Sequence, residues 1–172
     1  MSAIRTEMRD AAETRAEVKN LVYREARFLD EKKWHDWLDL YTEDAVFWMP
    51  SWAGEYETTS DPELELNLVY LKGRAHLEDR VFRLETEDSF ASVPMARTAH
   101  LVGGVMLDKA GDGEVKARAS WIVHSFGLHG AVTRGGWYEY LLRRAPAGLK
   151  IARKKITMID DKLVGPVDFF HI

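Results

Sequence analysis

The 172-residue chain contains no cysteine, and this absence excludes several kinds of chemistry. Without a thiol the chain alone forms no disulfide, presents no cysteine nucleophile and supplies no cysteine ligand to zinc or to an iron–sulfur cluster. Chemistry of that kind, if the protein takes part in it, must depend on a partner chain.

Two further features are missing, a long apolar run and an excess of basic charge. No stretch approaches the roughly 18 apolar residues of a membrane span, and the first 20 residues have no apolar core of a signal peptide. Lysine and arginine number 24 against 28 aspartates and glutamates, a net charge of −4, whereas a nucleic-acid protein needs a basic field. We therefore expect a cytoplasmic protein that binds neither membranes nor nucleic acids.

The composition is that of a globular chain, with 46% hydrophobic and 30% charged residues. A chain of this length has room for one core, and the sequence shows no internal repeat, low-complexity tract or linker. We expect a single domain over residues 1–172.

The first half of the chain has the periodicity of amphipathic helices. One helix of roughly twenty residues precedes a short helix, and a third follows Gly73. Their apolar stripes are Val18, Leu21, Val22, Phe28 and Leu29; then Trp34, Trp37, Leu38 and Tyr41; then Leu77, Val81 and Leu84. Between the second and third helices, residues 45–49 and 66–71 read as strands, the latter at a sheet edge or in a lid.

From Arg97 the hydrophobic period changes to two, which predicts long antiparallel strands. A turn at 108–113 closes a hairpin, a loop is expected at 127–136, and strands are expected at 137–144 and 149–159. The fold class predicted is α+β, a cone in which a strongly bent, mostly antiparallel sheet is closed by about three N-terminal helices.

Neither the histidines nor the glycine pairs form a recognisable ligand motif. The six histidines, at 35, 76, 100, 124, 129 and 171, include no HxxxH pair, so we expect surface or structural hydrogen-bonding roles. Gly103-Gly104 and Gly135-Gly136 lack the spacing of phosphate loops and predict a bulge or a close backbone approach.

A bent sheet closed by helices can enclose a pocket, so an enzyme of this fold is a second hypothesis. Its acid/base candidates are His100, beside Arg97, with Asp44 and Tyr41. The alternative for these residues is structural: Asp44 caps a turn, and His100 makes a structural hydrogen bond or lies at an interface.

Residues 134–155 are basic, with Glu139 their one acidic residue. The seven lysines and arginines are Arg134, Arg143, Arg144, Lys150, Arg153, Lys154 and Lys155. This segment either meets an acidic partner or forms an ordinary solvated strand face.

Seven segments of the chain together resemble the small (β) subunit of Rieske-type aromatic-ring-hydroxylating dioxygenases. They are Glu25-Ala-Arg-Phe-Leu-Asp30, Trp34 with Trp37-Leu38, Phe47-Trp-Met-Pro50, Leu77-Glu-Asp-Arg-Val81, Arg97-Thr-Ala-His100, Tyr138-Glu-Tyr-Leu-Leu-Arg-Arg144 and Leu149-Lys-Ile-Ala-Arg153. Phe47-Trp-Met-Pro50 followed by Trp52, with the helix around Leu77, looks most like the benzoate, toluate and anthranilate branch.

The resemblance implies a cystatin-like or NTF2-like cone in an α3β3 hexamer. In that assembly the partner α (large) subunit carries the Rieske [2Fe-2S] cluster and the mononuclear Fe(II), and a reductase delivers electrons from NAD(P)H. The resemblance thus implies no catalytic, cofactor-binding or metal-binding residue in this chain. It implies instead a structural subunit of an enzyme that cis-dihydroxylates an aromatic acid such as benzoate or anthranilate.

A structural subunit needs surfaces that meet other chains. The chain ends in apolar residues, so we predict that Phe169 and Phe170 are buried against the sheet or a neighbouring chain. Aromatic, methionine and arginine residues are enriched at interfaces. The full set of interface candidates is Trp48, Met49, Trp52, Arg97, His100, Phe169 and Phe170. A stand-alone dehydratase or isomerase and a small-ligand binding module remain the alternatives to the β subunit.

Overall fold

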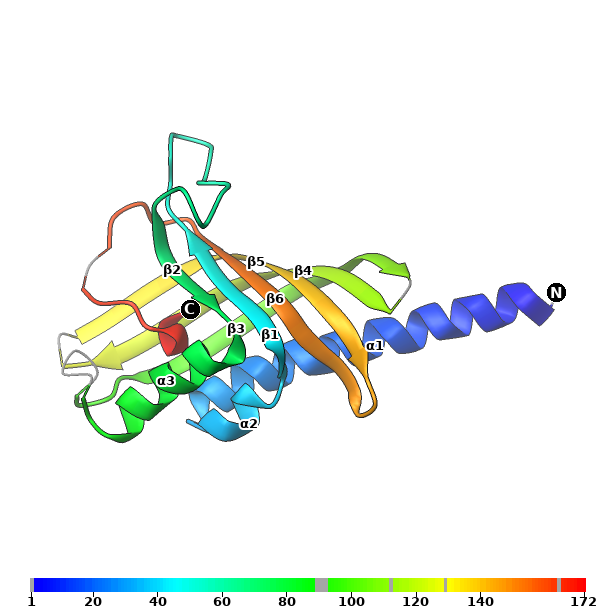
Figure 1. The fold of residues 1–172 in the computed structure, drawn as a ribbon, viewed down its shortest axis with the longest axis horizontal. Coiled ribbons are helices and arrows are strands. Elements are labelled where there is room, and N and C mark those ends of the chain that lie inside the picture. The colour runs from blue at the N-terminus through cyan, green and yellow to red at the C-terminus, as the bar shows by residue number, and fades with distance from the viewer. Residues whose placement is uncertain (1, 89–92, 112, 129, 164) are drawn as a thin grey trace.

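The computed structural model of the protein describes residues 2–88, 93–111, 113–128, 130–163 and 165–172, and within these ranges the side chains of all but residues 2–9 and 109. Its helices and strands are named as in Figure 1. Among the helices described, none combines the length and apolarity needed to cross a membrane.

Three α-helices form before the long strands. They are α1 (Ser2–Asp30), α2 (Trp34–Leu38) and α3 (Arg74–Glu85). The apolar stripe of α1 is buried, as Val18, Leu21 and Leu29 are each at most 4% exposed, which confirms the periodicity. The helix is longer than predicted, at 29 residues, because polar helix-forming residues extend it toward the N-terminus beyond the apolar stripe.

Six strands form one sheet in the order β2-β1-β6-β5-β4-β3. The strands are β1 (Tyr41–Pro50), β2 (Asn67–Lys72), β3 (Arg97–Gly111), β4 (Glu114–Gly127), β5 (Gly130–Ala145) and β6 (Gly148–Met158). All neighbours are antiparallel except β1 and β6, which are parallel. The sheet is long and bent, and the helices lie along its concave side (Figure 1). The predicted fold class is therefore confirmed, and β2 is the predicted edge strand.

Three predicted boundaries are wrong. The turn predicted at 108–113 is shorter, because β3 continues to Gly111 and β4 begins at Glu114. Tyr41 opens β1 instead of ending α2, because the Leu40 carbonyl already accepts the Ile151 amide and the chain has joined the sheet. Most of the loop expected at 127–136 is strand, since β4 runs to Gly127 and residues from Gly130 onward pair in register with β4. Glycines that suggested a loop instead occupy strand positions.

The glycine pairs have the backbone roles that the sequence predicted. Between Gly103 and Met106 the β3–β4 register shifts, and Gly104 has a φ of 59°, so this pair forms a bulge in the edge strand. At Gly136 an added Cβ would lie 1.9 Å from the Thr157 carbonyl oxygen, so β5 and β6 approach one another too closely for a side chain.

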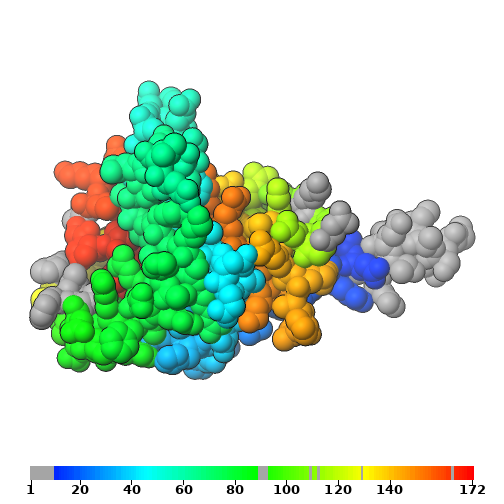
Figure 2. Space-filling model, viewed as in Figure 1, coloured from blue at the N-terminus to red at the C-terminus, as the bar shows by residue number. Residues whose placement is uncertain are grey.

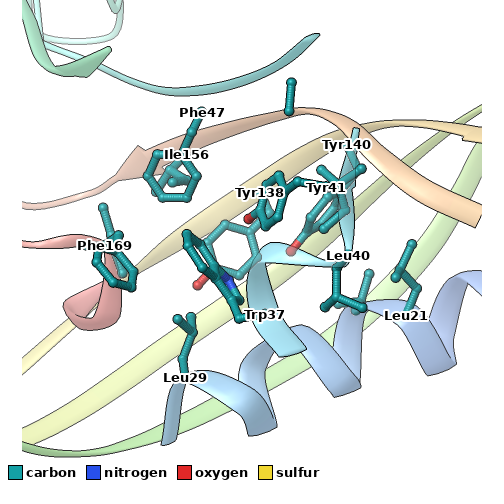
Figure 3. Close-up of a cluster of buried hydrophobic side chains, with 14 of the residues drawn as sticks. Leu21, Leu29, Trp37, Leu40, Tyr41, Phe47, Tyr138, Tyr140, Ile156 and Phe169 are labelled. Atoms are coloured by element: carbon teal, nitrogen blue, oxygen red, sulfur yellow. The ribbon is translucent and has the colours of Figure 1, made fainter. Parts of the chain in front are cut away.

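The core lies between the helices and the concave face of the sheet, and it is rich in aromatic rings. Trp37 is stacked on Phe169 with ring centroids 4.7 Å apart and meets Tyr41 edge-on at 4.9 Å (Figure 3). Phe169 begins a short 3-10 helix, η2 (Phe169–His171), capped by the Asp168 side chain. The prediction that Phe169 and Phe170 are buried is confirmed, and they are buried within their own chain.

Candidate functional site

The structure does not bring the three acid/base candidates together. His100 Nδ1 lies 2.6 Å from Asp30 Oδ1. Asp44 is on the surface, where its carboxylate accepts a 2.6 Å hydrogen bond from Arg143 Nη1. The Tyr41 hydroxyl is buried and donates to Glu25. Each candidate therefore serves a different part of the fold.

The pair of Asp30 and His100 joins the end of α1 to the edge strand β3. Asp30 also accepts hydrogen bonds from the His100 amide and from the Thr98 hydroxyl, each at 2.9 Å. Burial acts to raise the pKa of Asp30, but the hydrogen bonds from His100 and Thr98 outweigh it and the pKa is lowered. The His100 side chain is 1% exposed, and its Nε2 has no hydrogen-bond partner among the described residues.

A second polar cluster lies inside the core, around the Glu25 carboxylate. Lys154 Nζ lies 2.9 Å from Glu25 Oε1, Tyr140 donates to Oε2 at 2.8 Å, and Tyr41 donates to Oε1. Lys154 Nζ also sits 3.9 Å above the ring centroid of Tyr138. Figure 3 shows the rings of Tyr41, Tyr138 and Tyr140 close together in this part of the core.

Burial controls the protonation of this cluster. It lowers the pKa of Lys154 against the opposing effect of Glu25, and together with the Glu25 charge it raises the pKa values of the three tyrosines well above their usual range. The Glu25 and Lys154 side chains are 2% and 1% exposed. A charge pair buried to this extent is held by its neighbours in the core and takes part in the packing of the fold.

The sequence contained a signal for this cluster that the reasoning from motifs missed. Glu25 lies on the apolar stripe of α1, between Leu21 and Leu29, and Lys154 occupies an inward position of β6. A charged residue at a core position is rarely fully buried unless it is paired. The two residues are 129 positions apart, so their pairing was not visible in the sequence.

Two hollows on the molecular surface lie away from this cluster. One of about 520 Å³ runs between α1 and β3 and is lined by Tyr23, Arg27, Asp30 and Leu101, among others. Another of about 470 Å³ lies between α2 and α3. Neither is lined by Glu25 or Lys154.

Five of the histidines have hydrogen-bond or ion-pair partners, and His129 lies outside the described residues. The five partners are Glu85 for His35, the Lys72 carbonyl for His76, Asp30 for His100, Thr133 for His124 and the Asp168 amide for His171. Within the described ranges, no group of three or more histidines, aspartates or glutamates is placed to hold a metal ion.

The interface candidates divide into buried and surface residues. Met49, Phe169 and Phe170 are at most 2% exposed, Trp48 is 6% exposed, and the His100 side chain is buried as described above. Trp52 is half-buried and donates to the Met158 carbonyl, while Arg97 is exposed with its guanidinium 5.3 Å from the ring centroid of Phe126. An interface role for the set remains a prediction. Of these residues, Trp52 and Arg97 are the ones whose side chains are at least partly exposed on the surface of this chain.

The bent sheet, its three helices and its aromatic core define an NTF2-like α+β protein. A solved NTF2-like protein with a cystatin-like fold from Novosphingobium aromaticivorans has a TM-score of 0.66 at 19% identity, over 94% of this chain and 92% of that one, which shows the fold alone. The family model described as "Ring hydroxylating beta subunit" matches residues 24–164. The chain therefore belongs to the family of ring-hydroxylating dioxygenase β subunits.

Individual relatives agree with the family. The chain is 34% identical to the benzoate 1,2-dioxygenase subunit beta of Acinetobacter baylyi over 91% of its length and 92% of the relative's. It is 35% identical to the toluate 1,2-dioxygenase subunit beta of Pseudomonas putida, over 90% and 96%. The crystal structure of the benzoate 1,2-dioxygenase beta subunit of Burkholderia mallei has a TM-score of 0.75 at 36% identity, over 91% and 96%. The resemblance to the benzoate and toluate branch is thereby confirmed.

Proposed function

We propose that this chain is the noncatalytic, structural β subunit of an α3β3 dioxygenase that cis-dihydroxylates an aromatic acid such as benzoate or anthranilate. The partner α subunit carries the Rieske [2Fe-2S] cluster and the mononuclear Fe(II), and a reductase supplies electrons from NAD(P)H. The chain acts as a single domain over residues 1–172, in the cytoplasm.

The main support from the structure is the buried, hydrogen-bonded interior of the cone. In the NTF2-like fold this interior is the natural place for a pocket. Here many of its described side chains are buried aromatic rings, and the Glu25 carboxylate bonds to Lys154, Tyr41 and Tyr140. Buried aromatic rings and a paired buried charge are typical of the packed interior of a structural subunit.

The chain's own residues do not fit either iron centre. A Rieske cluster needs two cysteines with two histidines, and the chain has no cysteine. A mononuclear iron needs a facial group of two histidines and a carboxylate, and the described residues contain no such group. Both centres are therefore assigned to the α subunit. The aromatic acid is inferred from the names of the benzoate and toluate dioxygenase relatives.

Coexpression with the α subunit tests the proposal. We expect light scattering to give the mass of α3β3 for the purified complex, with iron and benzoate-dependent oxygen uptake in the same sample, and no iron or oxygen uptake for this chain alone. A chain that stays monomeric or dimeric in the presence of the α subunit would contradict the proposal.

The pocket-enzyme hypothesis keeps one observation in its favour, the Asp30–His100 pair with its unpartnered Nε2. A His100→Gln substitution separates the two functions. If the chain is a structural subunit, the complex that assembles with this variant keeps its oxygen uptake per iron. If His100 is an acid or base, the isolated wild-type chain has a turnover of its own and the variant loses it.

A further inference from the structure

The chain between β1 and β2 forms an arm, residues 51–66, that stands out from the body of the molecule (Figure 1, Figure 2). Its own hydrogen bonds hold its shape. Trp52 and Thr58 pair as a β-bridge, the Glu65 carboxylate accepts from the amides of Ser60 and Asp61 at 2.7 and 2.6 Å, and the Asp61 carboxylate accepts from the Glu63 amide at 2.9 Å. These hydrogen bonds give the backbone of the arm a defined conformation, and this conformation fixes the directions of its side chains.

The surface of the arm is both apolar and acidic. Tyr56, Leu64 and Leu66 are 84%, 85% and 76% exposed. The arm contains five acidic residues and neither a lysine nor an arginine; the acidic residues are Glu55, Glu57, Asp61, Glu63 and Glu65. Exposure of leucine side chains to water is unfavourable, and covering them with another apolar surface lowers the free energy of the system. The arm therefore has the properties of a docking element whose receptor is apolar and basic.

The convex face of the sheet, which the helices do not cover, has an apolar half. Leu101 on β3 pairs in register with Ile122 on β4, Ile122 pairs with Gly135 on β5, and Ile159 donates its amide to the Gly135 carbonyl. These three apolar side chains are 64%, 50% and 63% exposed. Because Gly135 carries no side chain, the strand between Ile122 and Ile159 adds none to this row of the sheet.

The other half of the convex face is basic. Lys116 and Arg153 flank Leu141 in one row, and Arg118 and Lys155 flank Glu139 in the next. Arg118 and Lys155 have acidic neighbours, Asp108 at 2.7 Å and Glu139 at 3.6 Å. Lys116 and Arg153 are exposed and make no ion pair with any described residue. The convex face thus has the two properties that the arm requires of its receptor.

We propose that the arm of one β subunit docks on the convex sheet face of the next, with its leucines over the row of Ile122 and the Glu55 and Glu57 carboxylates toward Lys116 and Arg153. Of the other three acidic residues, Glu63 is paired with Lys72 of its own chain, and Asp61 and Glu65 accept hydrogen bonds within the arm. This inference rests on the α3β3 assembly of the proposed function. A three-membered ring needs a heterologous interface, in which two different patches meet, because a patch that meets itself closes a dimer. The arm and the convex face are two such patches, complementary in charge and both partly apolar.

The absence of cysteine allows a direct test by cross-linking. Tyr56→Cys and Ile122→Cys chains are each coexpressed with the α subunit, alone and as a mixture, and the purified complexes are treated with a bis-maleimide. We expect a β–β product only from the mixture, since each single variant carries its cysteine on one side of the contact. A mixture of Tyr56→Cys with Phe82→Cys, an exposed position on α3, is the control and should give no β–β product.

The other outcomes separate the docking inference from the proposed function. If wild-type chains give an α3β3 particle but the mixture gives no β–β product, the docking inference is wrong and the proposed function stands. A β–β product from Ile122→Cys alone, or an α–β product from Tyr56→Cys, assigns these surfaces to other contacts and overturns it as well. If no α3β3 particle forms, both fail.

A charge exchange tests the polar half of the contact. Glu55→Lys with Glu57→Lys should reduce the share of β subunit recovered in the hexamer, because it places lysines beside Lys116 and Arg153. Lys116→Glu with Arg153→Glu should do the same, and all four changes together should restore the hexamer. Failure of the four changes to restore it would overturn the docking inference.

Discussion

The two faces of β4 have the same backbone and opposite roles. On the concave face Val115, Ala117, Ala119, Trp121 and Val123 are at most 3% exposed. On the convex face the alternate residues from Lys116 to Phe126 are exposed, and among them Ile122 and Phe126 are 50% and 49% exposed. Strict alternation predicts an apolar inner face and a polar outer face, so the apolar residues on the outer face are the informative ones.

The charged groups differ between the faces in the same way. Lys154 points into the core and is held by Glu25, whereas Arg153 next to it is exposed on the convex face. The basic segment noted in the sequence is therefore divided by the fold. Arg143 forms an ion pair with Asp44, and Arg144 forms one with Glu17. The inner face stabilises the chain, and the outer face stays exposed.

The largest expected difference between the faces concerns the buried charge pair. A Lys154→Met substitution leaves the Glu25 carboxylate buried without its cation, and we expect a loss of about 3–5 kcal/mol in the free energy of unfolding. Adding Glu25→Gln should recover most of it, because glutamine carries no charge; its carbonyl oxygen accepts from one tyrosine hydroxyl and its NH2 group donates to the hydroxyl oxygen of the other. Urea denaturation measures both variants. If Lys154→Met alone has the same free energy of unfolding as the wild type, the Glu25–Lys154 pair does not stabilise the core.

The next effect concerns the C-terminal segment. Truncating Phe169 to alanine removes the ring that stacks on Trp37 and leaves a cavity, so we expect a loss of about 3 kcal/mol. The matched outer-face control is Phe126→Ala, which should cost much less. If thermal unfolding shows equal losses, Phe169 does not belong to the core in solution.

A pH effect of about 2–3 kcal/mol should arise from His171. Burial, with the nearby charges of Arg134, Lys32 and His100, lowers the pKa of His171 to about 4 from an ordinary value near 6.5. The unfolded chain binds the proton more readily, so His171 stabilises the fold fully above pH 6.5, and this stability is lost as the pH falls toward 4. Urea midpoints at pH 7 and 4.5 should show the loss in the wild type and a smaller one in His171→Gln; equal losses would contradict the assignment.

The smallest effect on the chain itself is expected on the convex face. Ile122→Ser should change the free energy of unfolding of the isolated chain by no more than about 0.5 kcal/mol, because the side chain is half exposed and packs little. The same substitution should reduce recovery of the hexamer. A large loss of stability in the isolated chain would mean that the outer face is part of the fold, and the comparison of the two faces would fail.

Much of the fold was predictable from local patterns. The stripe of α1, the start of α3 after Gly73 and the hairpin of β3 and β4 each follow from spacing within a short window. The candidate site was less predictable. Asp30 and Glu25 were visible as parts of a family motif, but His100 and Lys154, their partners, lie 70 and 129 residues away. Spacing along the chain carries no information on such pairs.

The sequence by itself determined the absence of thiol chemistry, the α+β class and the resemblance to dioxygenase β subunits, because composition, periodicity and motifs are properties of the chain alone. Only the tertiary structure decided that Lys154 is an interior residue and Arg153 a surface one, that Phe169 and Phe170 pack within their own chain, and that leucines of the arm and isoleucines of the convex face remain uncovered. The physical reason is that burial depends on which distant segments the folded sheet brings together, and each of these side chains has partners, or lacks them, far from its own position in the chain.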